Sequence, residues 1–182
     1  IGVAITLVVA SWLGFLHQSG ESKLEMKEVK IANSGEIELT GARYQGVTSS
    51  GQPFLITADQ ASEANDGSGH IDMQQPRAMI TLKNGQIIKL QSNYGVFDQP
   101  DDVVDMAGDV VVTQPAKNLE IASDALFADL KLGEMRSLVP VTVTDDARRI
   151  DAETMTVFDD GDRILFGGIA RMVIQNTGTT AN

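Results

Sequence analysis

The chain has 182 residues, of which 42% are hydrophobic and 21% charged, and its formal net charge at pH 7 is −11. This apolar fraction is too high for a disordered chain, and the acidic balance argues against nucleic acid as a partner, because the phosphates would repel it. The chain has no cysteine, which excludes disulfides, a thiolate nucleophile and Cys-ligated metal sites, and two histidines are too few for a His-rich one.

The first predicted element is an apolar run at the start of the chain. Residues 1–16 carry no charge, and Trp12 lies near the end of the run, where an aromatic side chain suits a membrane interface. A helix of this length spans about 24 Å, which is less than the ~30 Å hydrocarbon core. Because the sequence begins with Ile, we expect residues 1–18 to be an N-terminally incomplete transmembrane helix, followed by a polar connector over residues 19–30.

Two alternatives exist for this run. It resembles the apolar core of a cleaved signal peptide, which would leave a soluble carrier, but no A-x-A-like cleavage site follows it. The other alternative, a buried helix of a soluble protein, is disfavoured because the run is apolar on all sides.

From residue 31 onward the sequence predicts strands. Short runs rich in β-branched residues alternate with turn residues, and no long segment has the 3.6-residue period of a helix. Asn84-Gly85 is the strongest hairpin signal, because both central positions of a type I′ turn take a positive φ. The pattern predicts an all-β domain over residues 31–176, built from antiparallel hairpins, and a flexible tail over residues 177–182.

A repeat of about thirty residues underlies this strand pattern. Three segments align, each with an early polar residue, an apolar strand, a turn and a second apolar strand; the polar residues are Asn93, Asp124 and Glu153. Gly or Pro interrupts the apolar strands at intervals of 32, 32 and 28 residues, at Pro76, Gly108, Pro140 and Gly168. Because such residues mark bends in a strand, we expect repeated hairpins that stack on one another and curve around an apolar core.

The repeat resembles a known family. Residues 93–98 read Asn-Tyr-Gly-x-Phe-Asp and residues 104–112 read Val-Asp-Met-x-Gly-Asp-Val-Val-Val. Both are similar to the repeat of the lipopolysaccharide-transport β-jellyroll proteins, the LptA/LptC/OstA-like family. Gln75-Pro76 and residues 166–171 fit the same pattern. An apolar span ahead of the domain resembles the single-pass LptC type more than the soluble LptA type.

The resemblance implies a twisted, open β-jellyroll and a role in lipopolysaccharide transport and cell outer membrane biogenesis. In that family the jellyroll receives lipopolysaccharide extracted by an ABC transporter of LptB, LptF and LptG, and passes it to a periplasmic bridge of LptA-type jellyrolls. The resemblance therefore also implies a single-pass inner-membrane protein with its C-terminal domain in the periplasm. The family offers no catalytic residue and no cofactor to transfer, so we expect a protein that is not an enzyme.

A lipid carrier needs an apolar interior, and the alternation of side chains along each strand predicts which ones point inward. By alternation alone these residues form the core of any β-sandwich, whereas the resemblance makes them candidates for a lipid groove. The candidates are Phe54, Ile56, Ile71, Met73, Ile88, Leu90, Tyr94, Val104, Met106, Val110, Val112, Leu119, Ile121, Phe127, Val141, Val143, Ile164, Phe166 and Met172.

The last strand is the candidate partner edge. Residues 164–174 contain one charged residue, so the strand lacks the charges that usually protect a free edge. We expect an LptA-type jellyroll to pair with it, and the edge near residues 37–39 to face the transporter. The edge candidates are Ile164, Phe166, Ala170, Arg171, Met172, Val173 and Ile174.

Charged residues allow two further interpretations. Basic side chains at a groove rim could bind lipopolysaccharide phosphates, although each could equally pair with a nearby carboxylate; they are Arg43, Arg77, Lys89, Arg148, Arg149 and Arg171. The aspartate clusters at residues 98–109 and 159–162 lack the spacing of a calcium loop, so we predict no metal site. The alternative function is a membrane-anchored structural or polysaccharide-binding β-solenoid without a lipid cargo.

Overall fold

The computed structural model describes residues 24–25, 28–31, 37–48, 50–63 and 67–174. The expected transmembrane helix at residues 1–18 and the expected tail at residues 177–182 lie outside these ranges. Within the described ranges, no helix combines the length and the apolar character needed to cross a membrane.

Strands dominate the described residues. They are β1 (Leu24–Glu25), β2 (Glu28–Ile31), β3 (Ile37–Val47), β4 (Pro53–Glu63), β5 (His70–Gln74), β6 (Arg77–Thr81), β7 (Ile87–Gln91), β8 (Tyr94–Asp98), β9 (Val103–Gln114), β10 (Leu119–Asp129), β11 (Glu134–Ser137), β12 (Val141–Thr144), β13 (Arg148–Phe158) and β14 (Arg163–Ile174). Two short 3-10 turns, η1 (Pro115–Lys117) and η2 (Asp159–Gly161), connect β9 to β10 and β13 to β14.

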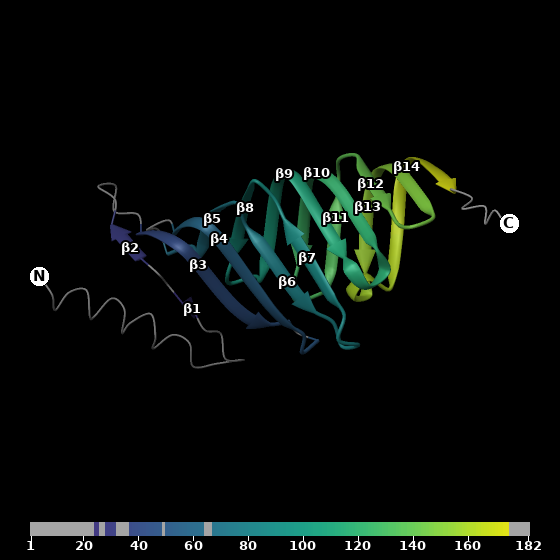
Figure 1. Ribbon diagram of the computed structural model, residues 1–182. Coiled ribbons are helices and arrows are strands. Elements are labelled where there is room, and N and C mark those ends of the chain that lie inside the picture. The colour runs from purple at the N-terminus through teal and green to yellow at the C-terminus, as the bar shows by residue number, and fades with distance from the viewer. Residues whose placement is uncertain (1–23, 26–27, 32–36, 49, 64–66, 175–182) are drawn as a thin grey trace, which may run out of the picture.

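All of these strands belong to one sheet, in which every pairing is antiparallel. Figure 1 shows them stacked along one axis, from β3 at the left to the yellow β14 at the right. The nearly all-β antiparallel architecture is the one that the sequence predicts, and it is consistent with a jellyroll. Strand pairing starts with β1 and β2, which pair with β3 and lie, except for Ile31, within the stretch expected to be a connector.

The sheet folds into two layers because its long strands take part in both. The first five residues of β9 pair with β8, whereas Val111–Thr113 pair with β7. The strands β10 and β13 likewise pair with β11 through one half and with β12 through the other. We call the two layers the β5–β8–β11 layer and the β6–β7–β12 layer, after the short strands that each contains.

The long strands bend along one line, which we call the corner. Gly108 and Asp109 both have positive φ and lie opposite the single residue Asp124, so the β9–β10 register shifts there. The β13–β14 register shifts in the same way where Gly168, with φ of 70°, meets Glu153. Pro76 lies between β5 and β6 and Pro140 between β11 and β12, where the chain passes from one layer to the other. The structure thus confirms the repeated bends.

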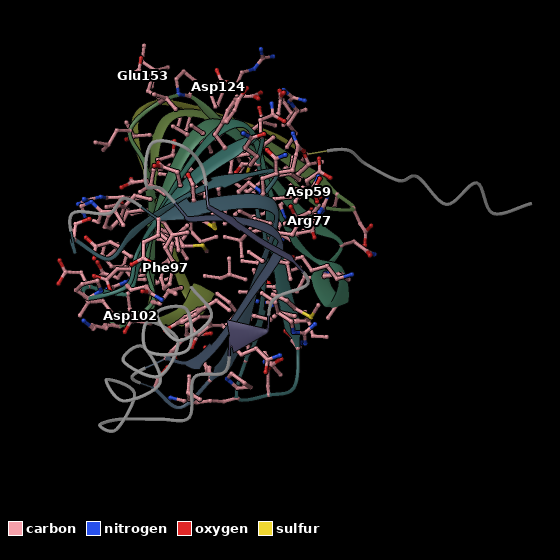
Figure 2. The ribbon with its side chains drawn as sticks, turned by 90° about the vertical axis from the view of Figure 1, so that its left-hand side faces the viewer. Asp59, Arg77, Phe97, Asp102, Asp124 and Glu153 are labelled. Atoms are coloured by element: carbon pink, nitrogen blue, oxygen red, sulfur yellow. The ribbon has the colours of Figure 1, made fainter. Side chains whose placement is uncertain are left out.

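The apolar side chains between the two layers form the core. The most enclosed members, at 1% exposure each, are Phe97, Val110, Met155 and Val157. Figure 2, which views the molecule end-on, shows Phe97 between the layers. The ring of Tyr44 packs against Phe97 with 4.9 Å between centroids, and against Phe54 with 5.9 Å. Burial of this apolar surface is the main free energy that closes the two layers on each other.

Candidate lipid-binding interior and strand edge

Most of the groove candidates face the space between the layers. Thirteen of the nineteen are buried core residues: Phe54, Ile56, Ile71, Met73, Ile88, Leu90, Val104, Met106, Val110, Val112, Ile121, Val141 and Val143. Leu119, Ile164 and Phe166 are partly buried and pack against this core. Their inward orientation agrees with the alternation, while their role in binding lipid stays a prediction.

Tyr94 does not face the interior. Its side chain is 64% exposed, and the buried residues of β8 are Gly95 and Phe97. The inward prediction for Tyr94 extends the alternation of side chains from Leu90 as if both residues lay on one strand. Residues 92 and 93 instead separate β7 from β8, and these two strands belong to different layers. The inward prediction for Tyr94 is therefore wrong, and the same error hid Phe97, the central aromatic residue of the core.

Two further candidates also fail, each beyond a bulge. Phe127 is only half-buried and lies under the guanidinium of Arg136, 4.2 Å from its ring centroid, while Leu126 and Ala128 point inward. The bulge at Asp124 lies between Ile121 and Leu126, and it reverses which residues of β10 point inward, from odd-numbered before it to even-numbered after it. Met172 follows the bulge at Gly168 and is 54% exposed. The alternation of β13 would have identified Met155 and Val157, which the sequence-based assignment left out.

The opening between the two layers is narrow. At the strand ends away from the corner, a crevice of about 30 Å³ lies between the two layers. This is roughly the volume of one water molecule in the liquid. Its lining from the β6–β7–β12 layer includes Thr48, Gln52, Ile80, Leu82 and Ile88, and its lining from the other layer includes Ala128, Leu130 and Met135. An acyl chain can therefore enter at this crevice only if the side chains or the layers move apart.

The last strand presents an edge. Among the described strands β14 pairs only with β13, so its other side carries unpaired backbone groups. Of the edge candidates, Ile164 and Phe166 pack against the core. Ala170, Arg171, Met172, Val173 and Ile174 are exposed. At the opposite end, the edge of β3 near residues 37–39 is already paired with β2 of the same chain.

Comparison with known proteins identifies the family. Residues 3–173 match the family model described as "Lipopolysaccharide-assembly, LptC-related". The chain belongs to the LptC family. This confirms the resemblance found in the repeat, and it means that the protein takes part in lipopolysaccharide transport. No curated protein matches the chain.

The basic candidates do not gather around the crevice in this LptC-family structure. Three of them are exposed arginines that pair with carboxylates: Arg77 with Asp59 at 2.9 Å, Arg148 with Asp145 at 2.6 Å, and Arg149 with Asp151 at 2.7 Å. Figure 2 shows Asp59 and Arg77 side by side near the outside of the fold. Hydrogen bonds from the guanidinium groups lower the pKa of Asp145 and that of Asp151. These contacts favour the carboxylate-pairing interpretation over phosphate binding.

The turns beside the crevice are tied together within each layer. The backbone N–H of Leu130 donates to the carbonyl of Asp102 at 3.0 Å, which joins two turns of the β5–β8–β11 layer. The side-chain amide of Gln114 donates to that of Gln86 at 2.8 Å within the other layer. Burial raises the pKa of the Asp102 carboxyl, Lys131 opposes this shift, and Asp129 and Asp101 add to it. Each of these bonds lies within one layer, and the crevice between the layers is lined by apolar side chains such as Leu82 and Leu130 together with the polar Gln52 and Glu134.

Proposed function

We propose that this protein receives lipopolysaccharide extracted from the inner membrane by an LptB/LptF/LptG-type ABC transporter and passes it to an LptA-type periplasmic jellyroll. The observation that carries the proposal is the apolar core that runs between the two layers along the stacked hairpins. Membership of the LptC family supports the cargo. The protein acts as a carrier rather than an enzyme, and ATP hydrolysis by the transporter supplies the energy.

The acyl chains occupy the interior, while the phosphorylated sugars stay in water. Admission requires the two layers to separate at the crevice, where the facing side chains include Leu82, Leu130 and Met135. These apolar side chains regain contacts with the acyl chain once the layers have separated. Met73, Met106 and Met155 lie deeper in the core, and the unbranched Met side chain adapts to an irregular apolar guest.

The two ends of the stack have different partners. Residues 1–18 anchor the protein in the inner membrane beside the transporter, and the domain lies in the periplasm. The unpaired side of β14 adds the first strand of the LptA-type jellyroll, which makes one sheet across the two proteins. The interiors of the two proteins then line up, and the lipid passes along them.

The filled interior favours a second candidate function. With a crevice of about 30 Å³ and buried side chains throughout the core, the domain also suits a membrane-anchored structural or polysaccharide-binding solenoid without a lipid cargo. The two candidates differ in whether acyl chains ever reach the core.

Site-specific photocrosslinking in cells that make lipopolysaccharide separates the two candidates. A photoreactive residue in place of the buried Met106 or the partly buried Phe166 should form a lipopolysaccharide adduct, and one in place of the exposed Gln91 should not. Equal expression and equal thermal stability of the variants are the control. An absence of adducts at both interior positions would leave the structural solenoid as the better description.

A further inference from the structure

A second concave surface lies on the outside of the β5–β8–β11 layer. This hollow measures about 490 Å³, and β3, β4, β5, β8, β9 and β10 contribute its lining. The exposed lining side chains include Gln60, Asp72, Gln74, Tyr94 and Asp105. These side chains project from the outer face of the sheet, away from the apolar interior, although the core residues Met73 and Met106 also line the hollow.

Strand register places the lining residues in two rows across the sheet. One row consists of the consecutive partners Thr40, Gln60, Gln74, Tyr94, Ala107 and Ala125. The next row consists of Ser62, Asp72, Val96 and Asp105. Because side chains in one row project from the same face, the polar groups of β4 and β5 lie beside the aromatic ring of β8.

The hollow owes its depth to small residues. Ala107 and Ala125 extend the first row beyond Tyr94, and neither has a side chain longer than a methyl group. Tyr94 itself is 64% exposed, so its ring projects beyond the short side chains of Ala107 and Ala125. A tyrosine in this position offers a flat apolar face and a hydroxyl group to a molecule in the hollow.

The polar lining is available for a ligand. Within the described part of the chain, the side chains of Gln60, Gln74, Asp72 and Asp105 make no hydrogen bond and no ion pair with the protein. The amides both donate and accept hydrogen bonds, and the carboxylates accept from hydroxyl groups. Amides, carboxylates and one exposed aromatic ring together suit a sugar, which has hydroxyl groups at its rim and an apolar C–H face.

We propose that the hollow binds uncharged sugar residues of the lipopolysaccharide saccharide. The C–H face of one sugar lies on the Tyr94 ring, and its hydroxyl groups bond to Gln60 and Gln74. Asp72 and Asp105 accept hydroxyl hydrogen bonds and repel phosphorylated sugars, which are anionic like the protein itself. The inference rests on the proposed function, because it takes the cargo to be lipopolysaccharide.

The two sites can serve one cargo molecule. A strand of five residues such as β8 spans about 17 Å from the corner to the far end of its layer. A saccharide of several sugars is long enough to leave the crevice and reach around the layer to the hollow. The interior would then hold the acyl chains while the outer face orients the saccharide.

Calorimetric titration of the full chain in detergent micelles tests the proposal. The probe is the oligosaccharide released from lipopolysaccharide by mild acid, without acyl chains and with its phosphates removed. Replacing Tyr94 by Ala should weaken binding by about tenfold, whereas Tyr94→Phe keeps the ring and should change affinity by less than about twofold. Gln74→Ala should weaken binding, and Gln91→Ala, at an exposed amide of the other layer, should not. Absence of binding by the parent chain, or equal affinity of the Y94A variant, would overturn the proposal.

The phosphorylated oligosaccharide provides a charge test. It should bind more weakly than the dephosphorylated probe, and the double replacement of Asp72 and Asp105 by Asn should remove most of that difference. Binding that grows tighter with phosphate would instead identify an anion site and overturn the proposal. Lipid adducts at Phe166, which packs against the core and does not line the hollow, report on the proposed function separately, so loss of oligosaccharide binding with intact adducts would reject the hollow alone.

Discussion

Glu153 lies directly against Gly168 across the β13–β14 bulge, so that a Cβ atom at Gly168 would be 2.8 Å from the Cβ of Glu153. Gly168 also has a φ of 70°, which residues with a side chain rarely adopt. Figure 2 shows Glu153 and Asp124 at the same edge of the fold in the end-on view, and Asp124 occupies the equivalent place in the β9–β10 bulge. The corner of the sheet thus depends on a glycine facing a polar residue.

Replacing Gly168 by Ala should therefore destabilise the domain more than a positive φ alone explains. Gly85 is the matched control, because its φ is 80° and nothing lies within 4 Å of a Cβ built there. We expect Gly85→Ala to cost about 1–2 kcal/mol and Gly168→Ala to cost at least about 1 kcal/mol more. Urea denaturation of both variants measures the difference, and equal midpoints would show that the corner tolerates the contact.

The edge of β14 gives a second prediction. Proline at Val173 removes a backbone N–H and should abolish binding to an LptA-type jellyroll, because strand addition depends on main-chain hydrogen bonds. Val173→Ala keeps the N–H and is the matched control. Binding is measured by pull-down or surface plasmon resonance, with lipid adducts at Met106 as the test of an intact interior. If the proline variant bound the partner as tightly as the alanine variant, β14 would not be the partner edge.

The raised pKa of Asp102 predicts a pH-dependent change in stability. Because the folded-state pKa lies above the ordinary value of 3.8, the folded protein holds this proton more tightly than the unfolded chain does. Stability is therefore lost as the pH rises through the folded-state pKa, and the penalty persists at neutral pH. Asp102→Asn removes it and keeps a residue type that tolerates the positive φ of 54° at this position.

The variant should be more stable at pH 7 by less than about 1 kcal/mol, since the carboxyl is partly exposed. The advantage should disappear below pH 3, where Asp102 is protonated in both states. Thermal denaturation of the two proteins across pH 3 to pH 7 gives the comparison. A difference that does not vary with pH would mean that burial of Asp102 has no energetic consequence.

The sequence predicts this fold well where the alternation of side chains is unbroken. Ile88 and Leu90 on β7, and Val141 and Val143 on β12, point inward because each pair lies within one regular strand. The bends at Gly108 and Gly168 were also recognisable, since the thirty-residue repeat aligns them. The predicted orientation is wrong where the alternation of inward and outward side chains is continued past a bulge, as at Phe127 beyond the bulge opposite Asp124.

The outer hollow could not be predicted in the same way. Gln60, Gln74 and Tyr94 are far apart in the sequence, and only strand pairing brings them into one row. The sequence places Tyr94 in the interior because only Ser92-Asn93 marks the end of one strand and the start of the next. Side-chain exposure on a curved sheet follows from the order of the strands, which a repeat pattern does not specify.

Acyl chains are expected to reach the core by separating the layers at the crevice, and a reversible crosslink tests this entry route most directly. Leu82 and Leu130 line the crevice from opposite layers, and the chain has no cysteine of its own, so cysteines at these two positions form the only thiol pair. With a photoreactive residue at Phe166, which packs against the core, lipopolysaccharide adducts should form while the thiols are reduced and disappear once a bismaleimide or a disulfide joins them. Adducts that form equally in the crosslinked and the reduced protein would contradict the claim.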